Sequence, residues 1–297
     1  MAQTKGQQRK TEARERARVR REQQRKAERR RKLVTGGTVI VAVVALVVAL
    51  VVVKVTSGSS SDKNLNAPVS AALAGAISSV QPAAYDEVKA GSASGGMKAA
   101  DAGDSPLTAG GKPEVLYVGG EFCPYCAAER WSLATALARF GTFEGLETTK
   151  SSSKDVYPNT ATLSFLDAKY TSQYLTFTPR EVQDRAGKDL QTLTDAQSAL
   201  LQKYTQGSIP FIDFGGKYIL GGAQYDPNTL KGLTADQIGQ KLGDPASPIA
   251  QAILGGANLT TAAICKLTGG QPGSVCNSTA VTSVAGQLTS GSTDGSS

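Results

Sequence analysis

Residues 112–140 impose the strongest constraint on the fold, because a predicted buried strand runs directly into two cysteines and a predicted helix. The segment 112–120, KPEVLYVGG, carries four consecutive apolar residues flanked by a proline and a glycine pair, which is typical of a short buried strand. The segment 124–140, PYCAAERWSLATALARF, starts with a proline, repeats apolar residues on one helical face, and is followed by Gly141. The two cysteines therefore lie in the turn between strand and helix.

The sequence after this helix predicts further alternation of strands and helices. A strand is predicted at 160–167, where apolar and polar residues alternate, and the helical pattern TDAQSALLQKY occupies 194–204. A hairpin with a Gly-Gly turn is predicted at 209–222, then helices at 234–242 and 247–265. This order predicts an α/β domain with a central mixed sheet flanked by helices.

Residues 33–53 form an apolar run without a single charge. A helix of about 20 such residues is long enough to cross a hydrocarbon core about 30 Å thick. Residues 1–32 carry 14 Lys and Arg and four Glu, a net charge of +10, so the rest of the +7 chain sums to −3. The positive-inside rule then predicts a cytoplasmic N-terminus and an extracytoplasmic remainder. A cleaved secretory signal and a buried core helix are the alternatives, although signal cores are shorter and no A-x-A-like cleavage site follows Val53.

Five regions are predicted from these patterns. The basic region favours contact with anionic lipid headgroups over nucleic acid, because it lacks interleaved aromatic residues. The predicted regions are a basic cytoplasmic tail (1–32), a transmembrane helix (33–53), an extracytoplasmic linker with short helical segments (54–111), the folded domain (112–276) and a disordered Ser/Thr/Gly-rich tail (277–297).

The absence of histidine removes several kinds of chemistry. Ser-His-Asp and Cys-His enzymes are excluded, as are zinc sites that use imidazole. A zinc site made only of thiolates would need all four cysteines, and one pair is separated by ten residues instead of the usual two to four. We therefore predict no metal and no other cofactor.

The first cysteine pair, Cys123 and Cys126, has the features of a redox-active dithiol. Cys123 is predicted to cap the helix that begins at Pro124, where free N–H groups and the helix dipole stabilise a thiolate. Cys123 is then the nucleophile, and Cys126, one turn inside the helix, resolves the mixed disulfide. The alternatives are a passive disulfide and chance spacing.

The second pair, Cys265 and Cys276, is predicted to form a structural disulfide. The loop between them, KLTGGQPGSV, is broken by Gly-Gly and Pro-Gly, which lets its ends meet. Closing a loop of this size would stabilise the fold by about 3 kcal/mol. The alternative is a second redox pair that relays electrons to or from Cys123 and Cys126.

The strand, the C-x-x-C helix start and the later Ile-Pro before a hairpin together resemble the thioredoxin fold. The resemblance implies that Pro210 is a cis-proline facing the dithiol and that the backbone of Ile209 pairs with substrate. Pro124 and Tyr125 of the CPYC tetrad, which is similar to that of glutaredoxins, complete the expected substrate-binding residues. Relative to thioredoxin, the stretch 168–189 is predicted to be an insertion.

A closer resemblance is to the family catalogued as domain of unknown function 929, thioredoxin-like proteins that are often membrane-anchored. The segments that carry it are GGEFCPYCAAERWSLATALARFG, DVYPNTATLSF, IPFIDFGGKY and the closing cysteine pair, within about 113–276.

The sequence therefore predicts a single-pass membrane protein with an extracytoplasmic thiol–disulfide oxidoreductase domain. Its expected substrates are exported proteins with thiols, and a membrane protein resembling vitamin K epoxide reductase is the expected redox partner. The motif leaves open whether electrons flow to or from the substrate, and the oligomeric state. The alternative is a non-catalytic scaffold of the cell envelope in which both disulfides are structural.

Overall fold

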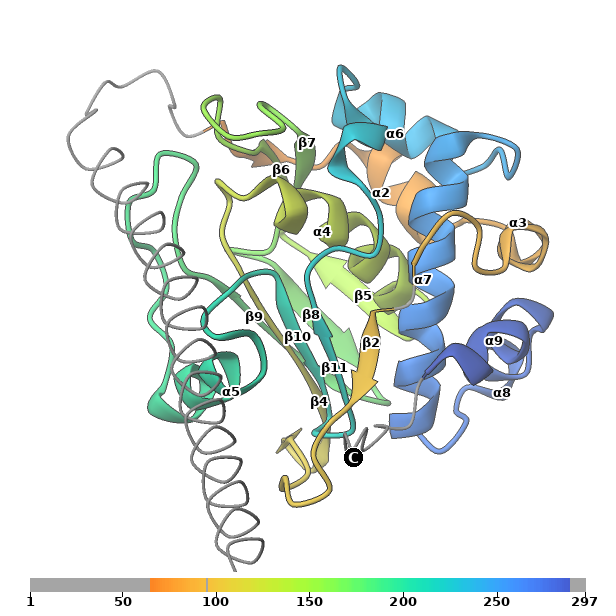
Figure 1. The fold of residues 1–297 in the computed structure, drawn as a ribbon. Helices are drawn as coiled ribbons and strands as arrows, with labels where there is room; N and C mark the ends of the chain where they lie inside the picture. The colour runs from red at the N-terminus through yellow and green to blue at the C-terminus, as the bar shows by residue number, and fades with distance from the viewer. Residues whose placement is uncertain (1–64, 95, 289–297) are drawn as a thin grey trace, which may run out of the picture. The chain divides into compact units, whose positions relative to one another are not determined.

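β4 (Lys112–Gly119) is the central strand of the main sheet in the computed structural model, which describes residues 65–94 and 96–288 (Figure 1). β10 (Phe211–Phe214) pairs antiparallel with one edge of β4, and β9 (Thr176–Glu181) pairs parallel with the other. The sheet is completed by β11 (Tyr218–Gly221) beside β10, β2 (Met97–Ala99) at the outer edge, and β3 (Thr108–Ala109), which pairs with the first two residues of β4. The predicted α/β class with a mixed sheet is confirmed.

Helices cover both faces of this sheet, as Figure 1 shows. Because side chains alternate along a strand, Val115 and Tyr117 of β4 belong to the larger core. That core includes α4 (Pro124–Leu137) and α7 (Pro248–Leu267). Leu116 and Val118 point to the opposite face, where α5 (Asp195–Thr205) packs.

The predicted strand at 160–167 is present, but the prediction of one central sheet was wrong for it. The segment 160–167 does contain β7 (Ala161–Ser164), but β7 pairs with β6 (Glu147–Lys150) in a separate small sheet that also includes β1 (Ala67–Pro68). The parallel neighbour of β4 is β9, which lies inside the stretch expected to be an insertion. The same stretch holds β8 (Lys169–Ser172), which pairs with β5 (Gly141–Glu144). The sequence of β9, TFTPRE, hides its role because a proline within a strand is tolerated only where the strand lacks a ladder partner on its outer edge, and because Glu181 is buried only through its pairing with Arg130.

The short helical segments predicted within 54–111 are present, but they belong to the folded domain, which therefore begins well before Lys112. Two helices, α2 (Ala71–Ser78) and α3 (Pro82–Val88), pack into the core, and β2 belongs to the main sheet. Their large apolar residues are few but correctly spaced, and the surrounding Ala, Gly and Ser conceal the pattern. The buried residues are Leu73, Ile77, Tyr85 and Val88.

The helices predicted in the second half of the chain are present. α5 and α6 (Ala235–Lys241) each begin with a capping box, at Thr194 and Thr234, and the short helix η1 (Pro227–Leu230) lies between β11 and α6. α7 is long and apolar enough to cross a membrane, but 89% of its apolar window is buried inside the protein. A helix that is apolar on all sides and covered by protein is a core helix.

The predicted transmembrane segment 33–53 lies outside the described residues.

The chain after α7 folds back onto the domain, so the predicted disorder of 277–297 was wrong for 277–288. α8 (Gly273–Cys276) is followed by α9 (Thr279–Val284) and the short helix η2 (Ala285–Gln287), and α9 packs against α3 and α7. Asp86 of α3 accepts a hydrogen bond of 2.7 Å from the backbone N–H of Ala280. Four buried apolar residues, Ala280, Val281, Val284 and Leu288, hold this region in place despite its Ser and Thr content. Residues 289–297 lie outside the described residues.

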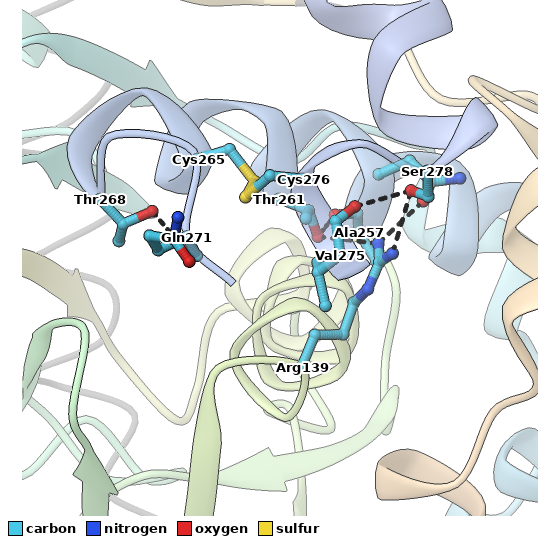
Figure 2. Close-up of a disulfide and its surroundings, with 10 residues drawn as sticks. Arg139, Ala257, Thr261, Cys265, Thr268, Gln271, Val275, Cys276 and Ser278 are labelled. Carbon is cyan, nitrogen blue, oxygen red and sulfur yellow. Dashed lines mark hydrogen bonds between the residues drawn. A yellow bond between two sulfur atoms is a disulfide. The ribbon is translucent and has the colours of Figure 1, made fainter. Parts of the chain in front are cut away.

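Cys265 and Cys276 are joined by a disulfide, as predicted (Figure 2). Beside it, the guanidinium of Arg139 donates to Asn258 and Thr261 of α7, at 3.2 Å each, and to Ser278 at 3.5 Å. The disulfide therefore lies where the end of α4, the end of α7 and the C-terminal helices meet.

We expect the double variant Cys265→Ala, Cys276→Ala to lower the free energy of unfolding by about 3 kcal/mol, because the unfolded chain gains the freedom of an open loop. Urea denaturation of the two full-length proteins measures this difference. Alkylation of Cys123 should stay unchanged, since the disulfide lies at the other end of the domain. An unchanged unfolding free energy would contradict the structural role.

Candidate functional site

Cys123 and Cys126 occupy the turn between β4 and α4, as the sequence predicted. Cys123 is the N-cap of α4 and Pro124 is its first residue, where the missing N–H of proline costs nothing. The backbone N–H of Cys126 donates to Cys123 Sγ at 3.2 Å, so the sulfur takes the place of a capping oxygen. Both cysteines are free thiols.

Ile209 and Pro210, which are 86 residues or more beyond Cys123 in sequence, meet it in space. The Sγ of Cys123 lies 3.9 Å from the backbone oxygen of Ile209, and the Ile209–Pro210 peptide bond is cis. Pro210 directly precedes β10, whose first residue, Phe211, pairs with Val118 near the end of β4. The three predicted catalytic residues therefore converge at one edge of the sheet.

The two thiols differ in environment. Cys123 is 6% exposed and Cys126 is completely buried. The pKa of Cys123 is lowered, chiefly because the side chain of Cys126 donates a hydrogen bond to it, and the nearby charge of Arg130 acts in the same direction against burial. Burial raises the pKa of Cys126 well above that of an ordinary thiol. Of the two thiols, Cys123 is therefore the one that ionises more readily.

Arg130 and Glu181 form a buried ion pair near the dithiol, which was not predicted from the sequence. Arg130 of α4 and Glu181 at the end of β9 form two hydrogen bonds, of 2.8 and 2.7 Å, and both side chains are completely buried. The ring of Tyr117 on β4 lies 5.9 Å from the guanidinium carbon. The one available signal was the spacing of Arg130, four residues after Cys126 on the same helical face.

The loop 151–160 lies beside the CPYC tetrad. The N–H of Ser152 donates to the backbone oxygen of Phe122 at 2.9 Å. The ring of Tyr157 meets the ring of Tyr125 edge to face, with centroids 5.8 Å apart, and the carboxylate of Asp226 raises the pKa of the Tyr157 hydroxyl. Tyr125 is 42% exposed whereas Pro124 is buried, so only Tyr125 of these two predicted substrate-binding residues presents a substantial surface.

A groove of about 520 Å³, lined in part by Ile209, lies between α5 and the β11–β2 edge. Lys98, Lys203 and Tyr204 are among the residues that line it. The charge of Lys203 is balanced by Asp101 and Asp104, with N–O distances of 2.9 and 2.5 Å. The dithiol edge therefore has an aromatic surface on one side and a polar groove beside Ile209.

These features fall within a known family. The family model described as Domain of unknown function (DUF929) matches residues 98–266, more than half of the chain. The chain belongs to the DUF929 family. No curated protein and no solved structure matches it. The matched part of this DUF929 protein runs from β2 into α7, so it contains the dithiol, the ion pair and Pro210, while Cys276 lies beyond it.

The disulfide of this DUF929 protein lies far from its dithiol. Leu267, two residues after Cys265, packs beside Gly215 at the end of β10, whereas Pro210 precedes the start of that strand. Direct electron exchange between the two pairs, the alternative that the sequence left open, would need the sulfurs in contact. Within residues 65–94 and 96–288, no group of three or more His, Cys, Asp or Glu side chains is arranged to hold a metal ion.

Glu129, three residues after Cys126 on α4, is a second buried ionisable side chain. Its carboxylate accepts a hydrogen bond of 3.0 Å from the N–H of Gln224, whose side-chain amide is hydrogen-bonded to Thr260 of α7 at 3.2 Å. Burial raises the pKa of Glu129 to about 8. The side chain is therefore neutral near pH 7 and joins α4 to α7.

We expect iodoacetamide to modify Cys123 at least about tenfold faster than Cys126 at pH 7, because only the Cys123 thiol has a lowered pKa. A short labelling pulse on the reduced full-length protein, followed by peptide mass spectrometry, measures both rates. In urea the two cysteines should react at similar rates, which is the control. Equal rates in the folded protein would contradict the proposed asymmetry.

Glu129→Gln should remove a pH dependence of stability. The folded wild type keeps a proton on Glu129 up to a pKa of about 8, whereas the unfolded chain releases it near the usual value of about 4.3. Wild-type stability should therefore fall relative to the variant by about 1.4 kcal/mol per pH unit between these values and level off above pH 8. Urea unfolding of both proteins from pH 5 to pH 9 measures the difference, and a constant difference would rule the effect out.

Proposed function

We propose that this DUF929 protein is a thiol–disulfide oxidoreductase that acts on exported proteins. The observation that carries the proposal is the pair of free thiols at the start of α4, one acidified at the N-cap and one buried behind it. A nucleophilic thiol next to a resolving thiol is what disulfide exchange requires.

The topology supports the same proposal. The strands β9, β4, β10 and β11 are neighbours in that order, with β9 parallel to β4 and the other two alternating in direction. The dithiol follows β4, and Pro210 precedes β10. This is the arrangement that the resemblance to thioredoxin implies, so we propose a thioredoxin-like domain extended by the N-terminal helices, the loop 151–160 and the C-terminal helices.

The exchange reaction follows from the two thiol environments. In the reducing direction, the Cys123 thiolate attacks a substrate disulfide, forms a mixed disulfide and releases one substrate sulfur as a thiolate. Cys126 then attacks Cys123 Sγ, so that Cys123 and Cys126 become a disulfide and the second substrate sulfur leaves as a thiol. Two electrons pass to the substrate. The oxidising direction is the reverse of these steps.

The surface around Cys123 supports an extended substrate chain. Tyr125 of the tetrad is exposed and meets Tyr157, whose neighbour Val156 is 72% exposed, and Ile209, next to Cys123, is among the residues that line the groove. We propose that the substrate cysteine approaches between Tyr125 and the groove, next to the Ile209 backbone. Loop 151–160 would then contact the part of the substrate that lies over Tyr125.

The proposed location comes from the segment 33–53 and the basic residues before it. A single span with its N-terminus in the cytoplasm puts the dithiol outside, where exported proteins form disulfides. In that compartment we favour oxidase or isomerase activity, with the dithiol reoxidised by a quinone-linked membrane protein resembling vitamin K epoxide reductase.

We expect Cys126→Ala to accumulate mixed disulfides with exported proteins, because the substrate stays bound to Cys123 when the resolving thiol is missing. Non-reducing gels and mass spectrometry of the full-length protein, expressed in a native envelope, detect these adducts. Cys123→Ala is the matched control and should trap none. Absence of adducts, together with insulin reduction unchanged in both variants, would favour the non-catalytic scaffold.

A further inference from the structure

Arg130 is a buried cation whose charge acts on both thiols of the dithiol. It follows Cys126 by four residues on α4, which places the two side chains on one helical face about 5–6 Å apart at Cβ. Its charge lowers the pKa of Cys123 and opposes the rise in the pKa of Cys126. The guanidinium thus acts on both sulfurs.

The guanidinium is only partly satisfied by its partner. Glu181 accepts from Nε and Nη2 of Arg130, but the buried Nη1 has no hydrogen-bond partner among the described residues. A buried donor without an acceptor is costly. A buried ion pair is also weak evidence for stability, since apolar residues of similar volume often replace such pairs without loss. The energetic cost of burying Arg130 with Nη1 unpaired points to a functional role for this residue, in which a negative charge forms close to the guanidinium.

The neighbouring elements add few other charges. Glu181 lies opposite Gly119 in the parallel pairing of β9 with β4, directly below the turn that leads to Cys123. Tyr117 occupies the space left by Gly119, where an added Cβ would lie 2.0 Å from the tyrosine oxygen, and burial raises the pKa of Tyr117 so that it stays neutral. Two further buried carboxylates lie near the dithiol: Glu121, which accepts from Asn66 and Ser164, and Glu129, which accepts from Gln224. The groups whose charge acts on the thiol of Cys126 are Cys123 and Arg130, and Glu181 is the ion-pair partner of Arg130.

We propose that Arg130 stabilises the thiolate of Cys126 during resolution of the mixed disulfide, and that Glu181 limits and orients this positive charge. The proposal rests on the proposed function and adds a named electrostatic partner to its second step. In that step Cys126 loses its proton, its thiolate attacks Cys123 Sγ, the bond from Cys123 to the substrate sulfur breaks, and the departing sulfur takes up a proton. Negative charge is present on Cys126 Sγ only while this step proceeds, close to the guanidinium.

The reaction of the reduced full-length protein with dithiobis(nitrobenzoate) separates the two steps. Attack by Cys123 releases one equivalent of the coloured thiolate at a rate that depends on reagent concentration. Attack by Cys126 on the mixed disulfide then releases a second equivalent at a rate that does not. A wild type without the second phase would count against the proposed function itself. A wild type with both phases leaves the role of Arg130 to the variants.

The key comparison is between Arg130→Met and Glu181→Gln, which break the same ion pair. Loss of an adjacent cation raises a thiol pKa by about 1–3 units. A rise of one pKa unit lowers the thiolate fraction of Cys126 about tenfold and raises the nucleophilicity of that thiolate about threefold, so the net rate falls about threefold. For a rise of 1–3 units, the second phase of Arg130→Met should therefore be about 3- to 30-fold slower near pH 7. Its pH profile should shift to higher pH. Glu181→Gln leaves the cation without its counter-charge, and should speed the same phase and shift its profile to lower pH.

We expect the two variants to change the rate of the second phase in opposite directions. An ion pair with a purely structural role would instead make the second phase slower in both variants. Equal slowing of both, or an unchanged second phase in Arg130→Met, would overturn the proposal. If Arg130→Met does not fold, the double variant Arg130→Met, Glu181→Met replaces it and should also be slower than wild type; a rate equal to or above wild type overturns the proposal. Arg139→Met, which removes a cation just beyond the C-terminal end of α4, is the matched control and should leave the second phase unchanged.

Discussion

β4 pairs with β10 on one side and with β9 on the other, and the position of the dithiol at the end of the sheet depends on this double pairing. Parallel β9 ends at the same edge of the sheet as β4, and antiparallel β10 begins there. The ends of these strands therefore bring together Glu181, the turn that carries Cys123, and Pro210, although they are far apart in sequence. The hydrogen bond from the N–H of Val182 to the oxygen of Gly119, 2.8 Å long, continues the pairing past the last strand residues and fixes this turn against β9.

α4 carries two consecutive buried ionisable side chains, and the cost of their burial is reduced in two different ways: one side chain is neutralised and the other is paired with an opposite charge. Glu129 and Arg130 are both completely buried, and because consecutive residues are about 100° apart on a helix they meet different neighbours. Glu129 lies against Gln224 and α7 and gives up its charge through a raised pKa. Arg130 lies against the sheet and keeps its charge through Glu181. Only the second arrangement leaves an electric field near the thiols.

Local patterns predicted the dithiol, the hairpin, the capped helices and the Cys265–Cys276 bond, because each depends on residues close in sequence. The same reasoning failed where partners were distant. β9 reads as an irregular segment until β4 lies beside it, and α9 reads as a disordered tail until α3 and α7 cover its three small apolar residues. The burial of Arg130 was not predicted, since the carboxylate that makes this burial tolerable comes from β9, 51 residues later.

The distance between the two cysteine pairs separates stability from exchange chemistry. A thiolate reacts only with a sulfur it can touch, so a bonded pair beyond the other end of β10 cannot serve Cys126 without a carrier. At that end the disulfide ties α7 to the chain that leads into α9, next to Arg139 and Ser278 (Figure 2). It therefore restrains the C-terminal helices that cover α3 and α7, while the thiols at the opposite end remain free to change their bonding without loosening that contact.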